Sequence, residues 1–343
     1  MSIRKNRNKN NDSGGMPDLK GQRILITGGL GFIGSNLAHR CVKSGAQVTI
    51  YDCRVPHSGA NLYNIRDIQD SVEMCYCDIL DFDKVSKHIV EKDIIFNCAA
   101  STSHHFSMRE PWIDMDVNSK GVINLLEAAH RFNPDIKFIH LGTSTQLGML
   151  YYKPADEKHP EFPTDIYSAN KSVSEKYVLI YAKAHKIRST VIRLSNVYGP
   201  RASIHSPEFT FNNFFIGLAL QGKDVEVFGK GSQLRNMIYV EDAVTALILA
   251  SQTDKVYGET FFAAGDKHYS VAQIAEEIMQ CMGSGKVKFV RWPKDRESVD
   301  VGDAVISNQK IKKTLNWTVK YDLKEGLIKT REYYKYCLER YLR

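Results

Sequence analysis

Residues 23–34, RILITGGLGFIG, run from a short apolar stretch through a cluster of glycines into a helical pattern. The apolar part, 23–29, predicts a buried strand, and the spacing of apolar residues over 31–43 predicts a helix. Glycines at such a turn let the backbone approach a pyrophosphate, and the first N–H groups of the helix attract its negative charge. The segment therefore predicts a dinucleotide site, built from Gly28, Gly31, Phe32, Ile33 and Gly34.

Apolar runs and helical patterns continue to alternate up to about residue 196. We expect strands at 47–52, 72–78, 93–100, 136–144 and 188–196, and helices at 82–90, 117–131 and 165–186. Continuous apolar strands joined by helices are typical of a parallel sheet that is covered on both faces. The sequence therefore predicts an α/β fold with a doubly wound, Rossmann-type parallel sheet.

Beyond residue 196 the elements become shorter and loops more frequent. Helices are expected at 240–251, 271–281 and 323–341, the last of them packed on the surface. These elements predict a smaller mixed α/β lobe over the carboxyl edge of the sheet, where ligands bind in such folds. The expected division is a disordered basic tail (1–20), a dinucleotide-binding domain (21–196) and a mainly substrate-binding lobe (197–343), with the chain free to cross between the lobes.

Composition narrows the class of protein. The 343 residues carry a net charge of +7 and seven irregularly spaced cysteines without a C-x-x-C pair. This pattern argues against a disulfide framework or a metal site and favours a reducing cytoplasm. No apolar run approaches the ~18 residues of a membrane helix. Because the basic residues form no basic-aromatic module, we expect a phosphorylated substrate and neither nucleic acid nor membrane as partner.

Asp52 ends the second expected strand, 18 residues after Gly34. A carboxylate there accepts hydrogen bonds from the adenosine ribose and repels a 2′-phosphate, which favours NAD over NADP. Arg54 lies two residues further on and keeps the NADP alternative open. Other strand ends should also lie beside the ligands: Asp78, Ile79, Ala99 and Ala100 at the cofactor, and Ser101 at the substrate.

Tyr167 and Lys171 are four residues apart at the start of an expected helix and so share one face. A free tyrosine has a pKa of ~10 and is a poor base at neutral pH. A nearby ammonium and a nicotinamide charge favour the phenolate. A hydroxyl partner is expected from HLGTSTQ (140–146), where Thr143 or Ser144 could donate to a developing oxyanion.

Taken in order, the motifs resemble the extended short-chain dehydrogenase/reductase family of nucleotide-sugar epimerases and dehydratases, UDP-glucose 4-epimerase among them. The resemblance runs from about residue 22 to about residue 317. It rests on TGGLGFIG, Asp52, Asp78, NCAAS, Asn118, GTSTQLG, YSANK, RLSNVYGPR and GKGSQLRNMIYVEDAV.

The resemblance implies roles for individual residues. Thr143 would complete a catalytic triad with Tyr167 and Lys171, while Asn118 and Tyr198 would lie along the cofactor. Contacts to a nucleotide-diphosphate sugar would come from Ser101, Thr145, Asn196, Phe228, Arg235 and Arg296. Phe228 would lie beside the base, and the two arginines would grip the pyrophosphate, which suits guanidinium geometry. The resemblance also implies a homodimer that packs through helices 117–131 and 165–186.

The residues after the triad hydroxyl bear on the reaction. Dehydratases of this family carry a glutamate there as the base at C5, whereas this chain has Ser144 and Thr145. We therefore expect an NAD-dependent 4-epimerase, in which Tyr167 takes the 4-hydroxyl proton, C4 gives a hydride to NAD, and the hydride returns to the other face. A 4,6-dehydratase and a 4-dehydrogenase or ketoreductase are alternatives, and a non-enzymatic NAD-binding protein is a distant one.

Two departures from the family pattern concern the sugar. Leu147 stands where the family often has tyrosine, and His104 and His105 follow NCAAS near the expected sugar site. The histidines either contact the substrate or belong to an exposed loop. The substrate class suggests a role in glycan or polysaccharide precursor synthesis.

Overall fold

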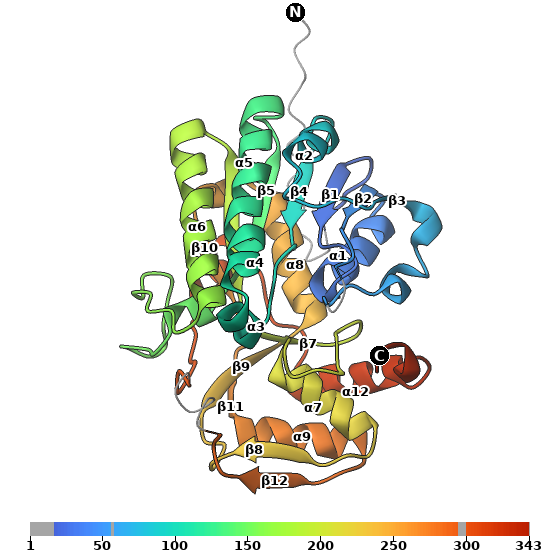
Figure 1. Cartoon of the computed structure of the whole chain (residues 1–343), viewed down its shortest axis with the longest axis vertical. Helices are drawn as coiled ribbons and strands as arrows, with labels where there is room; N and C mark the ends of the chain where they lie inside the picture. The colour runs from blue at the N-terminus through green and yellow to red at the C-terminus, as the bar shows by residue number, and fades with distance from the viewer. Residues whose placement is uncertain (1–16, 56–57, 294–299, 343) are drawn as a thin grey trace, which may run out of the picture.

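The computed structural model describes residues 17–55, 58–293 and 300–342 (Figure 1). Its strands are β1 (Arg23–Thr27), β2 (Gln47–Tyr51), β3 (Val72–Cys75), β4 (Ile94–Asn97), β5 (Lys137–Thr143), β6 (Arg188–Leu194), β7 (Asn196–Tyr198), β8 (Val225–Phe228), β9 (Leu234–Tyr239), β10 (Thr260–Ala263), β11 (His268–Ser270) and β12 (Val287–Val290). Its helices are α1 (Phe32–Lys43), α2 (Phe82–Ile89), α3 (His104–Arg109), α4 (Pro111–Met115), α5 (Gly121–Phe132), α6 (Ile166–His185), α7 (Phe211–Leu220), α8 (Val240–Ser251), α9 (Val271–Met282), α11 (Gln309–Leu315) and α12 (Leu323–Tyr334). Among the described helices, none has the length and apolar character needed to cross a membrane.

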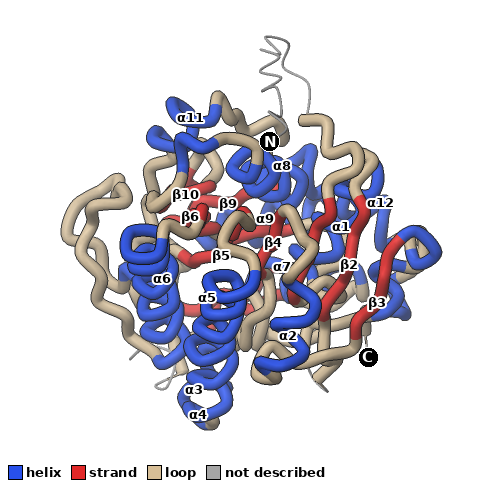
Figure 2. The backbone as a smooth tube through the Cα atoms, turned by 90° about the horizontal axis from the view of Figure 1, so that it is seen from above, coloured by secondary structure: helices blue, strands red, loops and turns tan. Residues whose placement is uncertain are grey.

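The large sheet confirms the predicted Rossmann-type fold. Its seven strands lie in the order β10-β6-β5-β4-β1-β2-β3, and every neighbouring pair is parallel. Figure 2 shows α2, α5 and α6 on one face and α1 and α8 on the other. Successive residues of β1 alternate between these layers, since Ile24 and Ile26 belong to one core cluster and Leu25 to the other. Burial on both faces is why the strand is continuously apolar.

The smaller lobe lies beyond the carboxyl edge of this sheet (Figure 1). It contains a three-stranded sheet ordered β11-β9-β7 and a parallel β8–β12 pair, with α7, α9 and α12 packed around them. The chain crosses between the lobes, because β10 returns to the large sheet and pairs with β6.

Some expected elements are wrong in extent. The helix expected at 323–341 ends at Tyr334, and a 3-10 turn follows at Leu338–Arg340. The bend lets the Tyr341 hydroxyl donate to Asn64 at 2.6 Å. Leu19, which we assigned to the basic tail, is fully buried against the core; residues 1–16 of that tail lie outside the described residues.

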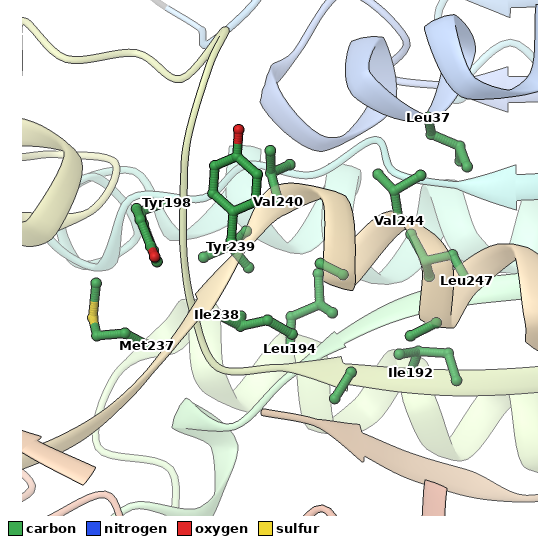
Figure 3. Close-up of a cluster of buried hydrophobic side chains, with 14 of the residues drawn as sticks. Leu37, Ile192, Leu194, Tyr198, Met237, Ile238, Tyr239, Val240, Val244 and Leu247 are labelled. Atoms are coloured by element: carbon green, nitrogen blue, oxygen red, sulfur yellow. The ribbon is translucent and has the colours of Figure 1, made fainter. Parts of the chain in front are cut away.

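One hydrophobic core joins the two lobes. Figure 3 shows Leu37 and Leu247 of the large domain in the same cluster as Tyr198 and Tyr239 of the smaller lobe. The buried Tyr198 hydroxyl donates to the carbonyls of Asp322 (3.2 Å) and Leu323 (3.1 Å), at the start of α12. This contact fixes α12 against the joint between the lobes.

We predict that Gly326→Ala weakens this joint. A Cβ at position 326 would lie 2.2 Å from the Tyr198 hydroxyl oxygen, so the ring must move away from the α12 carbonyls. Overpacking of this kind costs about 1–3 kcal/mol, measurable as a lower free energy of unfolding in urea. Lys324→Ala, an exposed change on the same helix, is the control. Equal stability of the two variants would contradict the prediction.

Candidate active site

The glycine turn after β1 has no room for side chains. Gly28 has a φ of +64°, and a Cβ there would lie 2.8 Å from the Ala99 backbone. A Cβ on Gly34 would lie 2.3 Å from the Gly28 carbonyl oxygen. Gly31 begins α1 without a side-chain cap. The first N–H groups of α1 therefore receive no hydrogen bond from a capping side chain. An anion-binding helix terminus needs N–H groups that are uncapped in this way.

Asp52 follows β2 and is fixed at the tip of this turn. Its carboxylate accepts hydrogen bonds from the backbone N–H of Leu30 (3.1 Å) and of Arg54 (2.9 Å). Burial raises the pKa of Asp52, although these two bonds oppose the rise. The Arg54 guanidinium, the feature that kept NADP open, lies over the Tyr76 ring at 5.6 Å.

Asn118 is buried within a π-helical turn, Asp116–Lys120, that joins α4 to α5. Such turns are rare in proteins overall, but those that occur often lie at functional sites. The Asn118 amide donates to the Ser101 carbonyl at 2.8 Å, and its buried Oδ1 has no hydrogen-bond partner within the described part of the chain. The helix expected at 117–131 therefore begins earlier and carries a turn that the sequence pattern did not reveal.

The expected triad residues converge at the ends of β5 and α6. Thr143 ends β5, Tyr167 lies in the first turn of α6, and Lys171 follows one turn later. Burial raises the pKa of Tyr167, and interaction with the Thr143 hydroxyl partly offsets the rise. Burial lowers the pKa of Lys171 to about 8. Its ammonium group donates to the Leu141 carbonyl at 2.6 Å.

A buried polar chain behind Lys171 was missed at the sequence level. Thr27 donates to Asn97 (2.7 Å), whose amide contacts His140 Nδ1 (3.0 Å). His140 Nε2 lies 3.3 Å from both Lys171 Nζ and the Ser174 hydroxyl. Burial and the Lys171 charge lower the His140 pKa well below its usual value, so the ring is neutral. Polar side chains inside apolar strands were the available signal.

Hydroxyl groups continue from the triad toward the start of α6. Thr143 and Thr145 are 3.1 Å apart, and Ser168 lies 3.0 Å from Thr145. Ser168 also lies 3.1 Å from Asp165, the N-cap of α6. Thr145 is therefore held by its neighbours at the triad.

Gln146, the next residue, enters a buried ion network. Its amide donates to Glu161 (3.1 Å) and Glu175 (3.0 Å). Both carboxylates also pair with Arg193, whose side chain is 3% exposed. A buried pair of this kind is costly to break, so it fixes the loop after β5 against α6. These residues were not predicted from the sequence.

The expected substrate residues are spread over the smaller lobe and the sheet edge. Asn196 begins β7, and Phe228 packs on Trp292 with ring centroids 5.4 Å apart. Arg235 of β9 is mostly buried, donates to the carbonyls of Leu234 and Gly302, and lies 3.6 Å from Asp300. Arg296 lies outside the described residues.

The side chain of Tyr198, which was expected to lie along the cofactor, points into the core. The side chain has no exposed surface and packs against Tyr239. Its hydroxyl donates to backbone carbonyls at the start of α12. The Tyr198 ring is therefore enclosed at the joint between the lobes, and its expected place near the cofactor stays a prediction. The motif position alone did not reveal which way the ring points.

Comparison with known proteins gives consistent results. Residues 25–330 match the family model described as GDP-mannose 4,6 dehydratase. The chain is 31% identical over 333 residues to dTDP-D-glucose 4,6-dehydratase of Bos taurus, covering 94% of this chain and 92% of that one. It is also similar to the UDP-glucose 4-epimerase of Thermotoga maritima, solved with UDP-glucose (27% identity, TM-score 0.84, 92% of this chain and 100% of that one). A third similar protein is the dTDP-glucose 4,6-dehydratase of Bacillus anthracis, solved in complex with NAD (26% identity, TM-score 0.81, 93% and 98%).

We predict that the stability of the unsubstituted protein rises with pH above the pKa of Lys171 and that Lys171→Met removes this pH dependence. The pKa of Lys171 is about 8 in the folded state and ~10.5 in the unfolded state, so the unfolded state binds more protons between these values. Stability of the unsubstituted protein therefore rises with pH there, by about 3 kcal/mol in total. Urea unfolding at several pH values measures the difference.

Lys183→Met, an exposed change on the same helix, controls for the loss of one charge. A stability difference between the unsubstituted protein and Lys171→Met that stays constant from neutral pH upward would contradict the prediction.

Proposed function

The chain belongs to the GDP-mannose 4,6-dehydratase family of extended short-chain dehydrogenases/reductases, and on this premise we propose that it is an NAD-dependent nucleotide-sugar 4-epimerase. The observation that carries the proposal is the make-up of the β5 terminus. The two side chains that follow Thr143 are Ser144 and Thr145, and Thr145 is bonded to neighbouring hydroxyls. No carboxylate base occupies either position, which argues against the dehydratase alternative.

The glycine turn and its surroundings fit a nicotinamide dinucleotide. Gly28 and Gly34 permit the tight backbone packing of the turn between β1 and α1, the turn at which such folds bind a pyrophosphate. The Asp52 carboxylate would accept hydrogen bonds from a ribose, and the unsatisfied Oδ1 of Asn118 offers a further acceptor. When bound, the dinucleotide supplies the hydride acceptor and donor of the reaction.

Proton transfer belongs to the chain's own residues. Tyr167 takes the proton from the C4 hydroxyl, because the ammonium of Lys171 one turn behind it favours the phenolate. Thr143 donates a hydrogen bond to the C4 oxygen as it becomes a ketone oxygen. After the sugar has turned within the pocket, the Tyr167 phenol returns the proton to that oxygen.

Turning requires that the nucleotide part stays fixed. Arg235 uses some of its five N–H donors on backbone carbonyls, and those that remain suit a phosphate oxygen. We assign Arg235 to the pyrophosphate, together with Asn196 and Arg296, and Phe228 to the base. Ser101 lies beside Asn118 at the sugar end, since its carbonyl accepts from that amide.

We predict that a nucleotide hexose carrying deuterium at C4 becomes an isomer of unchanged mass that keeps the label at C4. The reason is that the hydride is stored and returned within one turnover. Mass spectrometry and NMR on a panel of nucleotide hexoses measure it. Loss of water would identify the dehydratase alternative, and accumulation of reduced cofactor the dehydrogenase.

The Tyr167→Phe variant ties this reaction to the site. It should lose about 10²–10⁴-fold in turnover, because the proton acceptor is gone, while NAD binding is kept. Tyr177→Phe removes a hydroxyl from the same helix and should leave turnover unchanged. The assignment fails if Tyr167→Phe turns over like the unsubstituted protein.

We also propose a homodimer that packs through α5 and α6. The outer face of α6 exposes Val173 (38%) and Ile180 (55%), seven residues apart on one face. Trp112 of the adjoining α4 is 74% exposed, and α4 contacts α6 directly. Apolar side chains gathered on one face are typical of an interface.

All seven cysteines are free thiols, which supports a location in the reducing cytoplasm.

Sedimentation tests the dimer. We predict that the unsubstituted protein sediments as a dimer and that Ile180→Glu sediments as a monomer, because a buried charge opposes association. Ile328→Glu, at an exposed position of α12, should leave the dimer intact. A monomeric unsubstituted protein would refute the interface.

A further inference from the structure

His104 is fixed beside the reacting tyrosine. It is the first residue of α3, and its ring lies edge-on against the Tyr167 ring, with centroids 4.8 Å apart and planes at 76°. Figure 1 shows α3 at the end of the helical layer that faces the smaller lobe. The three segments that carry His104, Thr143 and Tyr167 therefore meet at one edge of the sheet.

Asp165 holds the His104 ring. Its carboxylate lies 2.8 Å from His104 Nδ1, while its side chain is only 9% exposed. Asp165 is itself fixed, because it caps α6 through the Ser168 N–H at 2.8 Å and contacts the Ser168 hydroxyl. Burial alone would raise the pKa of Asp165, but its interactions with His104 and Ser168 together hold this pKa below its usual value. A charged carboxylate at Nδ1 keeps the ring proton on that nitrogen.

The other ring nitrogen is left available. Within the described residues, His104 Nε2 has no hydrogen-bond partner, and 39% of the side chain is exposed. An imidazole with its proton held on Nδ1 by a carboxylate presents a lone pair on Nε2, which is the arrangement of a general base.

We propose that His104 is a second acid–base residue of the site, which removes a proton from the carbon next to C4 once C4 is a ketone. Its substrate is a nucleoside-diphosphate 4-keto hexose. The proposal goes beyond C4 epimerisation but rests on it for forming the ketone. The proposed step eliminates no water, because the proton returns to carbon, so it is distinct from the dehydratase alternative.

The step balances without a redox partner. The C–H bond at C3 or C5 breaks, its proton moves to His104 Nε2, and its electron pair forms the enolate. The negative charge passes to the C4 oxygen, where the Tyr167 phenol and the Thr143 hydroxyl donate to it. The imidazolium, stabilised by Asp165, then returns a proton to carbon. When the imidazolium exchanges its proton with solvent, the carbon acquires solvent hydrogen.

The test supplies the ketone directly. NAD-loaded protein is incubated in D2O with thymidine-, uridine- and guanosine-diphosphate 4-keto-6-deoxyhexoses, and loss of the C3–H and C5–H signals is followed by NMR. We expect exchange at one of these carbons to exceed the rate in buffer by at least about 100-fold. His104→Asn, which keeps a donor toward Asp165 but has no base, should lose this acceleration.

Two further variants separate chemistry from folding. Asp165→Asn keeps the helix cap but not the charge, so exchange should fall while turnover of the C4-deuterated hexose continues. His105→Asn removes the neighbouring histidine and should leave exchange unchanged. No acceleration by the unsubstituted protein, or equal acceleration by His104→Asn, overturns the proposal. If the C4-deuterated hexose turns over but no exchange occurs, the proposed function holds and the proposed role of His104 is wrong. If exchange occurs without turnover at C4, the role of His104 holds and the proposed function is wrong.

Discussion

Lys171 buries an ammonium group against the carboxyl end of β5, where it donates to the Leu141 carbonyl at 2.6 Å. A buried charge is costly unless it is bonded, so this contact fixes the rotation of α6 about its axis. Tyr167 lies one turn earlier on the same face and is thereby brought to Thr143. His140, whose Nε2 lies 3.3 Å from Lys171 Nζ, is neutral and adds no second charge. The geometry of the candidate site follows from this position and rotation of α6.

The ion network around Arg193 also fixes the position of α6 against the sheet. Arg193 belongs to β6, Glu175 to α6 and Gln146 to the turn after β5. Helix, strand and loop are therefore tied by bonds that do not involve a ligand. The site is preorganised by its scaffold, which is what precise proton transfer requires. The smaller lobe is joined to this scaffold through one continuous core, since β10 returns to the large sheet.

Local pattern was sufficient where one element makes the feature. The glycine turn, the strand ends and the i, i+4 pair of Tyr167 and Lys171 are encoded within a few residues each, and the structure places them at one sheet edge. It was insufficient for Tyr198, because the motif does not determine the direction in which the ring points. It was also insufficient for the π-helical turn at Asn118, which sits inside an otherwise regular helical pattern.

The sequence by itself determined the doubly wound sheet, the dinucleotide turn and the family, because each depends on periodicity or on glycines at fixed spacing. Only the tertiary structure decided that His104 meets Asp165 and that Gln146 meets Arg193's carboxylate partners. The members of these sets lie 61 residues apart in the first case and 15 and 29 residues apart in the second. Packing of separate strand ends and helices brings them together, and no local pattern records a contact between segments that are distant in the chain.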